Sequence, residues 1–68
     1  MPKASQVLAA LKRDGWVEIR RKGSHITLEK AGRRVRWTHH HGEDLGNPMM
    51  ARVAKAFGYT LDDLRRML

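Results

Sequence analysis

The sequence contains no cysteine, and this absence excludes two of the usual ways to stabilise a small fold. Without thiols, the 68 residues can form neither a disulfide framework nor a thiolate zinc site. At this length, folding buries only about 60% of the surface that the unfolded chain exposes. We therefore expect a single domain over residues 1–68, with one small core that suffices alone or is helped by a partner.

Long apolar runs are also missing. No segment approaches the roughly 20 apolar residues that a membrane span needs. The first residues, Met1-Pro2-Lys3, lead into an amphipathic stretch and not into the apolar region of a signal peptide. The sequence therefore predicts a cytoplasmic protein that has no membrane partner.

Acidic residues are scarce, because seven Asp and Glu oppose fourteen Lys and Arg and leave a formal net charge of +7. Most of this excess lies between Lys12 and Arg36, where nine basic residues face three acidic ones, a local balance of +6. A surface that serves only solubility mixes both signs more evenly. We therefore expect a polyanionic partner, either a nucleic acid or an acidic protein surface.

The first apolar residues have helical spacing and predict an amphipathic helix over residues 4–13. Ser5 is the expected N-cap of this helix, and Gly15 is the expected left-handed residue that ends it. The spacing is carried by Val7, Leu8 and Leu11.

From Trp16 onward the period becomes two, which predicts a β-hairpin with a polar turn at residues 21–24. A second turn at residues 30–33 leads into a third strand. An antiparallel meander of this kind has one apolar and one polar face. The residues expected to meet the helices are Val17, Ile19, Ile26, Leu28, Val35 and Trp37.

Asn47 followed by Pro48 predicts the start of a second helix, with Asn47 as its cap and Gly58 at its end. The run Thr60-Leu61-Asp62-Asp63 predicts a capped third helix. These helices should bury Met49, Met50, Val53, Ala54 and Phe57, and then Leu61, Leu64, Met67 and Leu68. The order α-β-β-β-α-α predicts an α+β fold in which helices cover one face of a three-stranded antiparallel sheet.

His25 lies just beyond the first turn and out of phase with Ile26 and Leu28, so it should point outward into the basic region. An imidazole exchanges protons near neutral pH and can take one from a ribose 2′-hydroxyl, while neighbouring cations stabilise charge at phosphorus. Those are the components of metal-free RNA cleavage. A single exposed histidine beside a turn is also a common surface residue, so His25 alone does not define an active site.

Other residues favour plainer interpretations. In an extended chain the contiguous side chains of residues 39–41, all histidine, point alternately, which favours structural or phosphate-contacting roles over a metal site. Ser24 is expected to serve the turn and not to act as a nucleophile. Trp16 and Trp37 are expected to pack in the core, although aromatic rings can also stack on bases.

Together these segments resemble the HicA-type mRNA interferase toxins of type II toxin-antitoxin systems. The resemblance covers nearly the whole chain and rests on residues 11–16, the run Arg20-Arg21-Lys22-Gly23-Ser24-His25, the loop at 40–45, and Phe57-Gly58-Tyr59-Thr60. It implies a fold like that of double-stranded-RNA-binding domains and endoribonuclease activity without a metal or other cofactor. It also implies that His25 is the catalytic histidine and that a HicB-type antitoxin covers the active site.

An endoribonuclease of this type would inhibit translation and growth by cleaving mRNA. We expect it to be a monomer when free and part of a hetero-oligomer with its antitoxin. His40, Lys22 and a bound water are all candidates for the second proton-transfer group. The residues expected to contact RNA are Arg20, Arg21, Lys22, Ser24, Arg34, Arg36 and His40.

The chain departs from the family pattern at Thr38, where many members have proline, in the longer histidine run, and at Asn47-Pro48. These changes affect loop geometry and none removes His25. Two alternatives from other classes stay open at this point. One is a non-catalytic module that binds double-stranded RNA by its shape, and the other is a basic protein-interaction domain.

Overall fold

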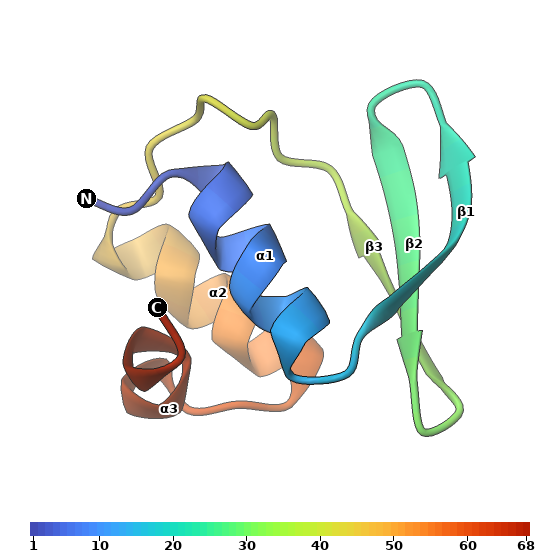
Figure 1. The fold of residues 1–68 in the computed structure, drawn as a ribbon. Coiled ribbons are helices and arrows are strands. Elements are labelled where there is room, and N and C mark those ends of the chain that lie inside the picture. Colours follow the sequence, from blue (N-terminus) through green and yellow to red (C-terminus); the bar gives the residue numbers. More distant parts are fainter.

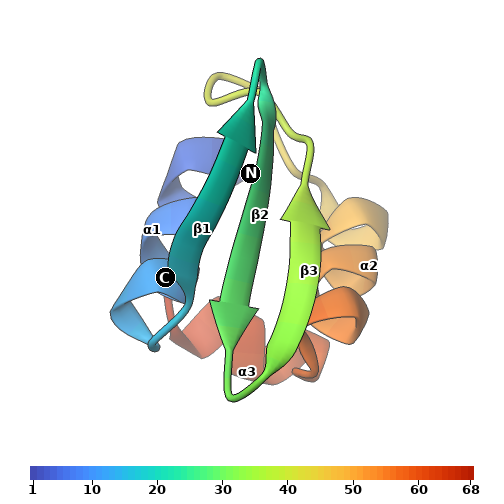
Figure 2. The same cartoon turned by 90° about the vertical axis from the view of Figure 1, so that its right-hand side faces the viewer.

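The computed structural model describes residues 1–68 and places a three-stranded antiparallel sheet against three helices (Figure 1). The elements are α1 (Ala4–Arg13), β1 (Val17–Lys22), β2 (His25–Lys30), β3 (Arg33–Trp37), α2 (Asn47–Phe57) and α3 (Leu61–Arg66). The strand order is β1-β2-β3, and all three helices lie behind the sheet when its uncovered face is viewed directly (Figure 2). The predicted α+β fold and element order are confirmed.

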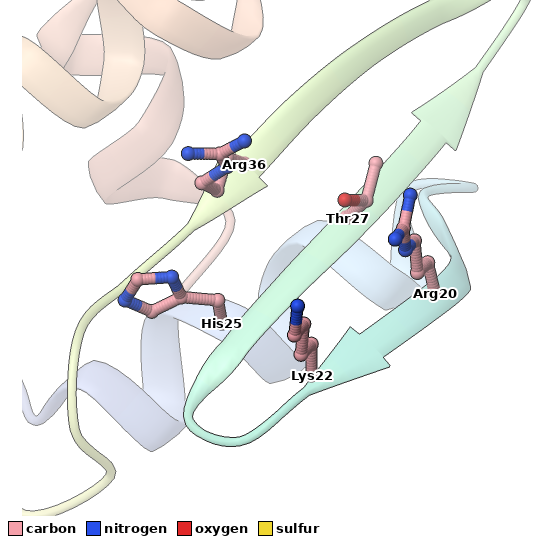
Figure 3. A pocket seen from close by; sticks show the side chains of 5 residues that line it. All are labelled: Arg20, Lys22, His25, Thr27 and Arg36. Atoms are coloured by element: carbon pink, nitrogen blue, oxygen red, sulfur yellow. The ribbon is translucent and has the colours of Figure 1, made fainter.

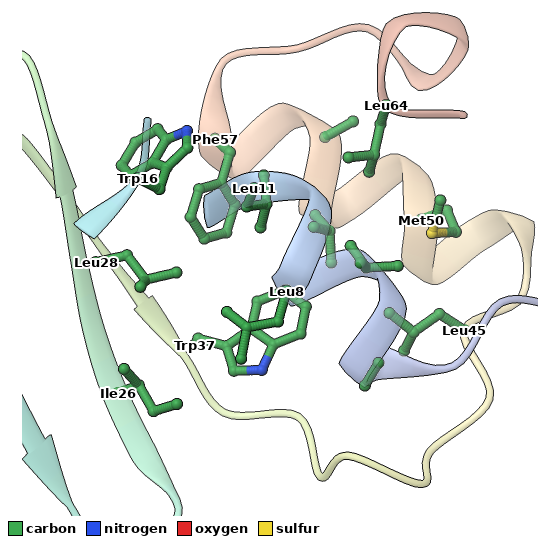
Figure 4. Close-up of a cluster of buried hydrophobic side chains, with 14 residues drawn as sticks. Leu8, Leu11, Trp16, Ile26, Leu28, Trp37, Leu45, Met50, Phe57 and Leu64 are labelled. Carbon is green, nitrogen blue, oxygen red and sulfur yellow. The ribbon is translucent and has the colours of Figure 1, made fainter. Parts of the chain in front are cut away.

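One cluster of fourteen buried apolar side chains fills the space between the sheet and the helices (Figure 4). Trp16 packs edge-to-face on Phe57 with ring centroids 4.7 Å apart, and its Nε1 donates a hydrogen bond of 2.9 Å to the hydroxyl of Tyr59. An aromatic pair of this geometry contributes about 0.5–1.5 kcal/mol beyond the area that it buries. Trp16 and Trp37 are both buried, so the predicted packing role is confirmed for each.

The prediction for β1 was wrong, because Val17 and Ile19 are 59% and 43% exposed. The pairing of β1 with β2 shifts between Glu18 and Arg20, as at a β-bulge, and this shift reverses the side-chain alternation. Val17 therefore pairs with Glu29 on the uncovered face of the sheet. The face that meets the helices is instead supplied by Ile26, Leu28 and Trp37, which are buried, and by the half-buried Val35.

The caps of α1 and α2 also differ from the prediction. Ser5 lies inside α1, whose N-cap is Lys3, and the Lys3 backbone N–H donates to Gln6 Oε1 at 2.8 Å. Asn47 is the first residue of α2 and Gly46 is its N-cap. The Asn47 side chain accepts a hydrogen bond from Arg65 of α3 and does not cap α2. This contact joins residues distant in sequence, which the local pattern around Asn47 does not contain.

Three helix boundaries follow the prediction. Gly15 and Gly58 adopt the positive φ angles of +106° and +85° that end α1 and α2. The Thr60 hydroxyl accepts a hydrogen bond of 3.0 Å from the Asp63 backbone N–H and caps α3. Leu68 was predicted to be buried but is 47% exposed, because α3 already ends at Arg66. None of the three helices has the length and apolar character that crossing a membrane requires.

Candidate functional site

The strand register brings polar side chains from all three strands together on the uncovered face of the sheet. Arg20 of β1 pairs with Thr27 of β2, and Thr27 pairs with Arg36 of β3, so the three form one row across the sheet. Lys22 and His25 pair in the next row, beside the turn that joins β1 to β2. Directly opposed residues on one face have Cβ atoms about 4.5–5.5 Å apart. The five side chains therefore share one surface.

These five residues line a shallow cavity of about 250 Å³ (Figure 3). The lining contains no acidic and no hydrophobic side chain. His25 is exposed, so its imidazole is accessible to a ligand in the cavity. Three cations, one imidazole and the Thr27 hydroxyl give this cavity hydrogen-bond donors from all three strands, a lining that suits an oxyanion.

The cations of the cavity differ from most others because they have no partner inside the chain. Nine of the fourteen Lys and Arg side chains hydrogen-bond or ion-pair with another group of the protein. An unpaired cation can bind a phosphate without first breaking an internal bond. The five that make no such bond are Arg20, Lys22, Arg36, Arg52 and Lys55.

Four of the predicted site residues, Arg20, Lys22, Arg36 and His25, line the cavity together, whereas the other four lie outside it. Arg21 pairs with Ile26 in the register and so lies on the helix side of the sheet, where its Nη2 is 2.7 Å from Glu18 Oε1. Arg34 lies on the uncovered face, with its Nε 2.7 Å from Glu29 Oε2. Ser24 lies in the turn between β1 and β2, and His40 is exposed in the loop after β3.

Thr27 lines the cavity but was absent from the predicted site. Its central position follows from the register, in which it lies between the two arginines. The alternation of β2 places Thr27 on the same face as His25, two residues earlier, and this signal is present in the sequence. The pairing with Arg20 could not be read there, because the register shift in β1 decides it.

The three contiguous histidines occupy different environments. The ring of His39 packs edge-on against Trp37, with centroids 5.0 Å apart, and its Nδ1 lies 3.0 Å from Glu43 Oε2. His40 and His41 are exposed. No group of three or more His, Cys, Asp or Glu side chains gathers closely enough to hold a metal ion.

At the other end of the sheet, a hydrogen-bonded network joins β2 to the helices. Lys30 Nζ lies 2.9 Å from Asp14 Oδ2, and the Tyr59 hydroxyl donates to the same carboxylate. The hydrogen bonds from Tyr59 and then from Lys30 lower the pKa of Asp14. The hydrogen bond from Lys30 to Asp14 raises the pKa of Lys30. Burial, and then the hydrogen bond that Tyr59 itself donates to Asp14, raise the pKa of Tyr59. Charges at this end are therefore engaged in holding the fold together.

The arrangement around His25 can bind a phosphodiester and exchange a proton beside it. Guanidinium groups flanking a phosphate stabilise the negative charge that develops during displacement at phosphorus. A neighbouring imidazole can act as a general base or acid once the reacting hydroxyl lies within hydrogen-bond reach, about 2.6–3.2 Å. The open shape of the cavity suits one strand of a polymer lying across the sheet.

Comparison with known proteins finds one family. Residues 4–61 match the family described as the HicA toxin of bacterial toxin-antitoxin. The match includes all three strands, the cavity around His25, and helices α1 and α2. Searches of curated proteins and of solved structures found no match to the chain.

Proposed function

The chain belongs to the HicA toxin family of bacterial toxin-antitoxin systems, and from that premise we propose that it is an endoribonuclease that cleaves mRNA on the uncovered face of its sheet. A toxin of such a pair acts against the cell unless its antitoxin binds it. Cleavage of mRNA would inhibit translation and growth. The proposal places the reaction in the cytoplasm, where mRNA is translated.

The observation that carries this proposal is the meeting of His25 with three unpaired cations in one cavity that contains no acid. RNA supplies both groups that this site lacks, because each nucleotide brings a phosphate for the cations and a 2′-hydroxyl for the imidazole. Arg20 and Arg36 lie on opposite sides of Thr27. A phosphate above Thr27 would therefore be held from two sides, with His25 in the adjoining row.

In the proposed reaction, His25 takes the proton of the 2′-hydroxyl and the 2′-oxygen attacks the adjacent phosphorus. The bond from phosphorus to the 5′-oxygen breaks, and that oxygen receives a proton as it leaves. The products are a 2′,3′-cyclic phosphate and a 5′-hydroxyl. Lys22, His40 and a bound water remain the candidates for the donor of the second proton. The mechanism requires no metal or other cofactor.

We assign the other predicted RNA contacts to the surroundings of the reacting phosphate. Arg34 lies on the uncovered face but must release Glu29 before it can bind phosphate. Arg21 must release Glu18 and lies on the helix side of the sheet, so it could contact only RNA that passes around the end of β1. Both contributions should therefore be smaller than those of the unpaired cations. Ser24 and His40 lie outside the cavity. Ser24 would contact a nucleotide further along the strand, and so would His40 if Lys22 or a bound water donates the second proton.

For the antitoxin, we propose a HicB-type protein that covers the cavity with an acidic or shape-matched surface. Carboxylates of such a partner would pair with the cations of the cavity, which are the same groups that RNA phosphates would bind. The toxin would then be a monomer when free and part of a hetero-oligomer when silenced.

The test is to purify the wild-type chain and His25→Ala and to follow RNA integrity, together with growth after induced expression. We expect His25→Ala to lose about 100-fold or more of the cleavage rate, as general acid-base catalysis contributes about 10²–10⁴-fold, while still binding RNA. His41→Ala is the matched control, because His41 is exposed and lies outside the cavity. Wild-type products should end in 2′,3′-cyclic phosphate and should form in EDTA.

Equal cleavage by His25→Ala and the wild type would refute the role of His25, and loss of cleavage in EDTA would indicate a metal. Wild-type protein that binds RNA with a steep salt dependence but leaves it intact would instead be a non-catalytic RNA-binding module. Failure to bind RNA at moderate salt would favour a protein-interaction domain.

A further inference from the structure

A second cavity lies between β3 and α2, around the edge of the sheet from the first. Its volume is about 180 Å³, and its lining combines apolar side chains with the three cationic or titratable groups Arg36, Arg52 and His39. Trp37 and Phe57 are buried, so the half-buried Met49 at the start of α2 supplies accessible floor. No acidic residue lines this cavity.

Arg36 lines both cavities, so the two adjoin at this side chain. β3 is an edge strand of the sheet, and α2 lies beside it (Figure 2). A polymer held over Thr27 would therefore reach the second cavity by crossing β3 at Arg36. On the far side it meets Arg52, which is exposed and, like Arg36, has no partner in the chain.

The two cavities differ in the chemistry that they can bind. The first is wholly polar and suits a phosphate, whereas the second has an apolar floor beneath a cationic rim. A nucleobase has apolar faces and polar edges and is linked to phosphates, which matches such a lining. Single-stranded RNA is commonly recognised by bases that leave the stack and lie on apolar or aromatic side chains. A cavity of about 180 Å³ is small, which suits a single flat ring and not a helix.

We propose that the cavity between β3 and α2 receives one nucleobase of the RNA whose phosphate lies at His25, with Arg52 bonding to the edge of that base or to its phosphate. This inference rests on the proposed function and adds a means by which the toxin selects where it cuts. The adaptable thioether of Met49 suits a floor that contacts a flat ring.

The experiment compares Arg52→Ala with Lys55→Ala. Both residues are exposed and unpaired and both lie on α2, and both substitutions remove one positive charge, but Lys55 lines neither cavity. Each protein cleaves a short single-stranded RNA and a series of the same RNA with one abasic nucleotide at successive positions near the cut. Melting temperatures of the two variants check that folding is equal.

For the wild type, we expect one abasic position near the cut to lower kcat/KM about tenfold, since stacking of a base is worth about 1–3 kcal/mol. Arg52→Ala should lower kcat/KM on the intact RNA about tenfold and should reduce the penalty at that position, because the base then lacks its bond to the guanidinium. Lys55→Ala should keep the penalty. Arg52→Lys, which retains the charge but not the planar guanidinium, should recover part of the loss.

Cleavage by the wild type with no dependence on any abasic position, or with equal effects of Arg52→Ala and Lys55→Ala, would overturn the base site and leave the proposed function standing. If Arg52→Ala cleaves RNA normally but binds the antitoxin more weakly, the cavity is a protein-docking site and the inference is wrong. Absence of any wild-type cleavage would instead overturn the proposed function, and this inference with it.

Discussion

The two ends of the sheet use positive charge in opposite ways. Beside the turn that joins β2 to β3, Lys30 is bonded to Asp14, Arg34 to Glu29, and Arg33 donates to the carbonyl oxygen of Ala56 at 2.8 Å. Beside the turn that joins β1 to β2, the cations on the uncovered face have no partner. They are Arg20, Lys22 and Arg36. The first end connects the sheet to its helices, and the second leaves its charges unpaired on the surface.

The difference implies a cost in stability at the unpaired end. Like charges held close together repel one another, and a fold with only fifteen buried residues has little stability to spare. A ligand that binds only the folded state and neutralises these charges would stabilise it by mass action. RNA and an acidic antitoxin would both act in this way, so substrate and inhibitor should compete for one surface.

Among changes that compare the two ends, the largest expected effect comes from removing both arginines that flank Thr27. Each guanidinium that contacts the reacting phosphate should be worth about tenfold, or about 1.4 kcal/mol. Arg20→Ala combined with Arg36→Ala should therefore lower kcat/KM for RNA about 100-fold, measured with a fluorescent oligonucleotide. The matched control is Arg34→Ala, on the same face but already paired with Glu29, which should change kcat/KM by less than about threefold. Equal losses of kcat/KM in the double variant and in Arg34→Ala would show that pairing with an acidic residue does not decide which cations bind RNA.

A smaller effect is expected from disconnecting the paired end. Tyr59→Phe removes the hydroxyl that accepts from Trp16 Nε1 and donates to Asp14. Losing these hydrogen bonds should lower the free energy of unfolding by about 1–2 kcal/mol, measured by urea denaturation with circular dichroism. Cleavage per folded molecule should not change, because Tyr59 lies outside the cavity around His25. A fall in kcat/KM with unchanged stability would contradict the assignment of the paired end to stability and of the unpaired end to RNA binding.

The paired end should also give the fold a dependence on pH at both extremes. The pKa of Asp14 lies below its ordinary value of 3.8, so its contribution is present above that pH and is lost as the pH falls through the lowered pKa. Lys30 and Tyr59 have pKa values raised above 10.5 and 10.0, so their contributions are present below those values and are lost as the pH rises through the raised ones.

Melting temperatures between pH 3 and 11 check this prediction. Asp14→Asn should flatten the acid limb of the profile, and Tyr59→Phe should flatten part of the alkaline limb. If the melting temperature of Asp14→Asn falls as steeply at acid pH as that of the wild type, other carboxylates cause the acid unfolding. Asp63→Asn is a suitable comparison, because Asp63 forms an exposed pair with Arg66 within α3.

The sequence predicts the element order well because each helix and strand carries its own apolar period and its own terminal residues, such as Gly15 and Gly58. It does not predict the face on which β1 places Val17, because a register shift depends on the partner strand. His25 was identified from its position after a turn. Thr27 was missed, because its place between Arg20 and Arg36 depends on the register of all three strands.

The pairing of cations is the part of the site that local patterns do not contain. Lys30 and Lys22 are indistinguishable as basic residues flanking a turn. Only the fold brings Asp14, sixteen residues away, against Lys30 and leaves Lys22 without a partner. A basic segment in a sequence therefore predicts a polyanionic partner, but tertiary contacts decide which of its charges are free to bind that partner.

The smallest expected effect concerns Lys22 alone and tests whether the unpaired end does cost stability. Lys22→Gln should raise the free energy of unfolding by a few tenths of a kcal/mol at low salt, since it relieves repulsion between exposed charges, and the gain should vanish as salt screens them. RNA binding is best measured in the His25→Ala background, where the RNA is not cleaved and a role of Lys22 in proton transfer does not affect the result. In that background, Lys22→Gln should make the slope of the logarithm of the RNA-binding constant against the logarithm of the salt concentration shallower by about 0.7, the value for one contact with a single strand. Lys55→Gln removes an equally unpaired charge outside both cavities, and an equal change in slope would mean that net charge, and not the cavity, binds the RNA.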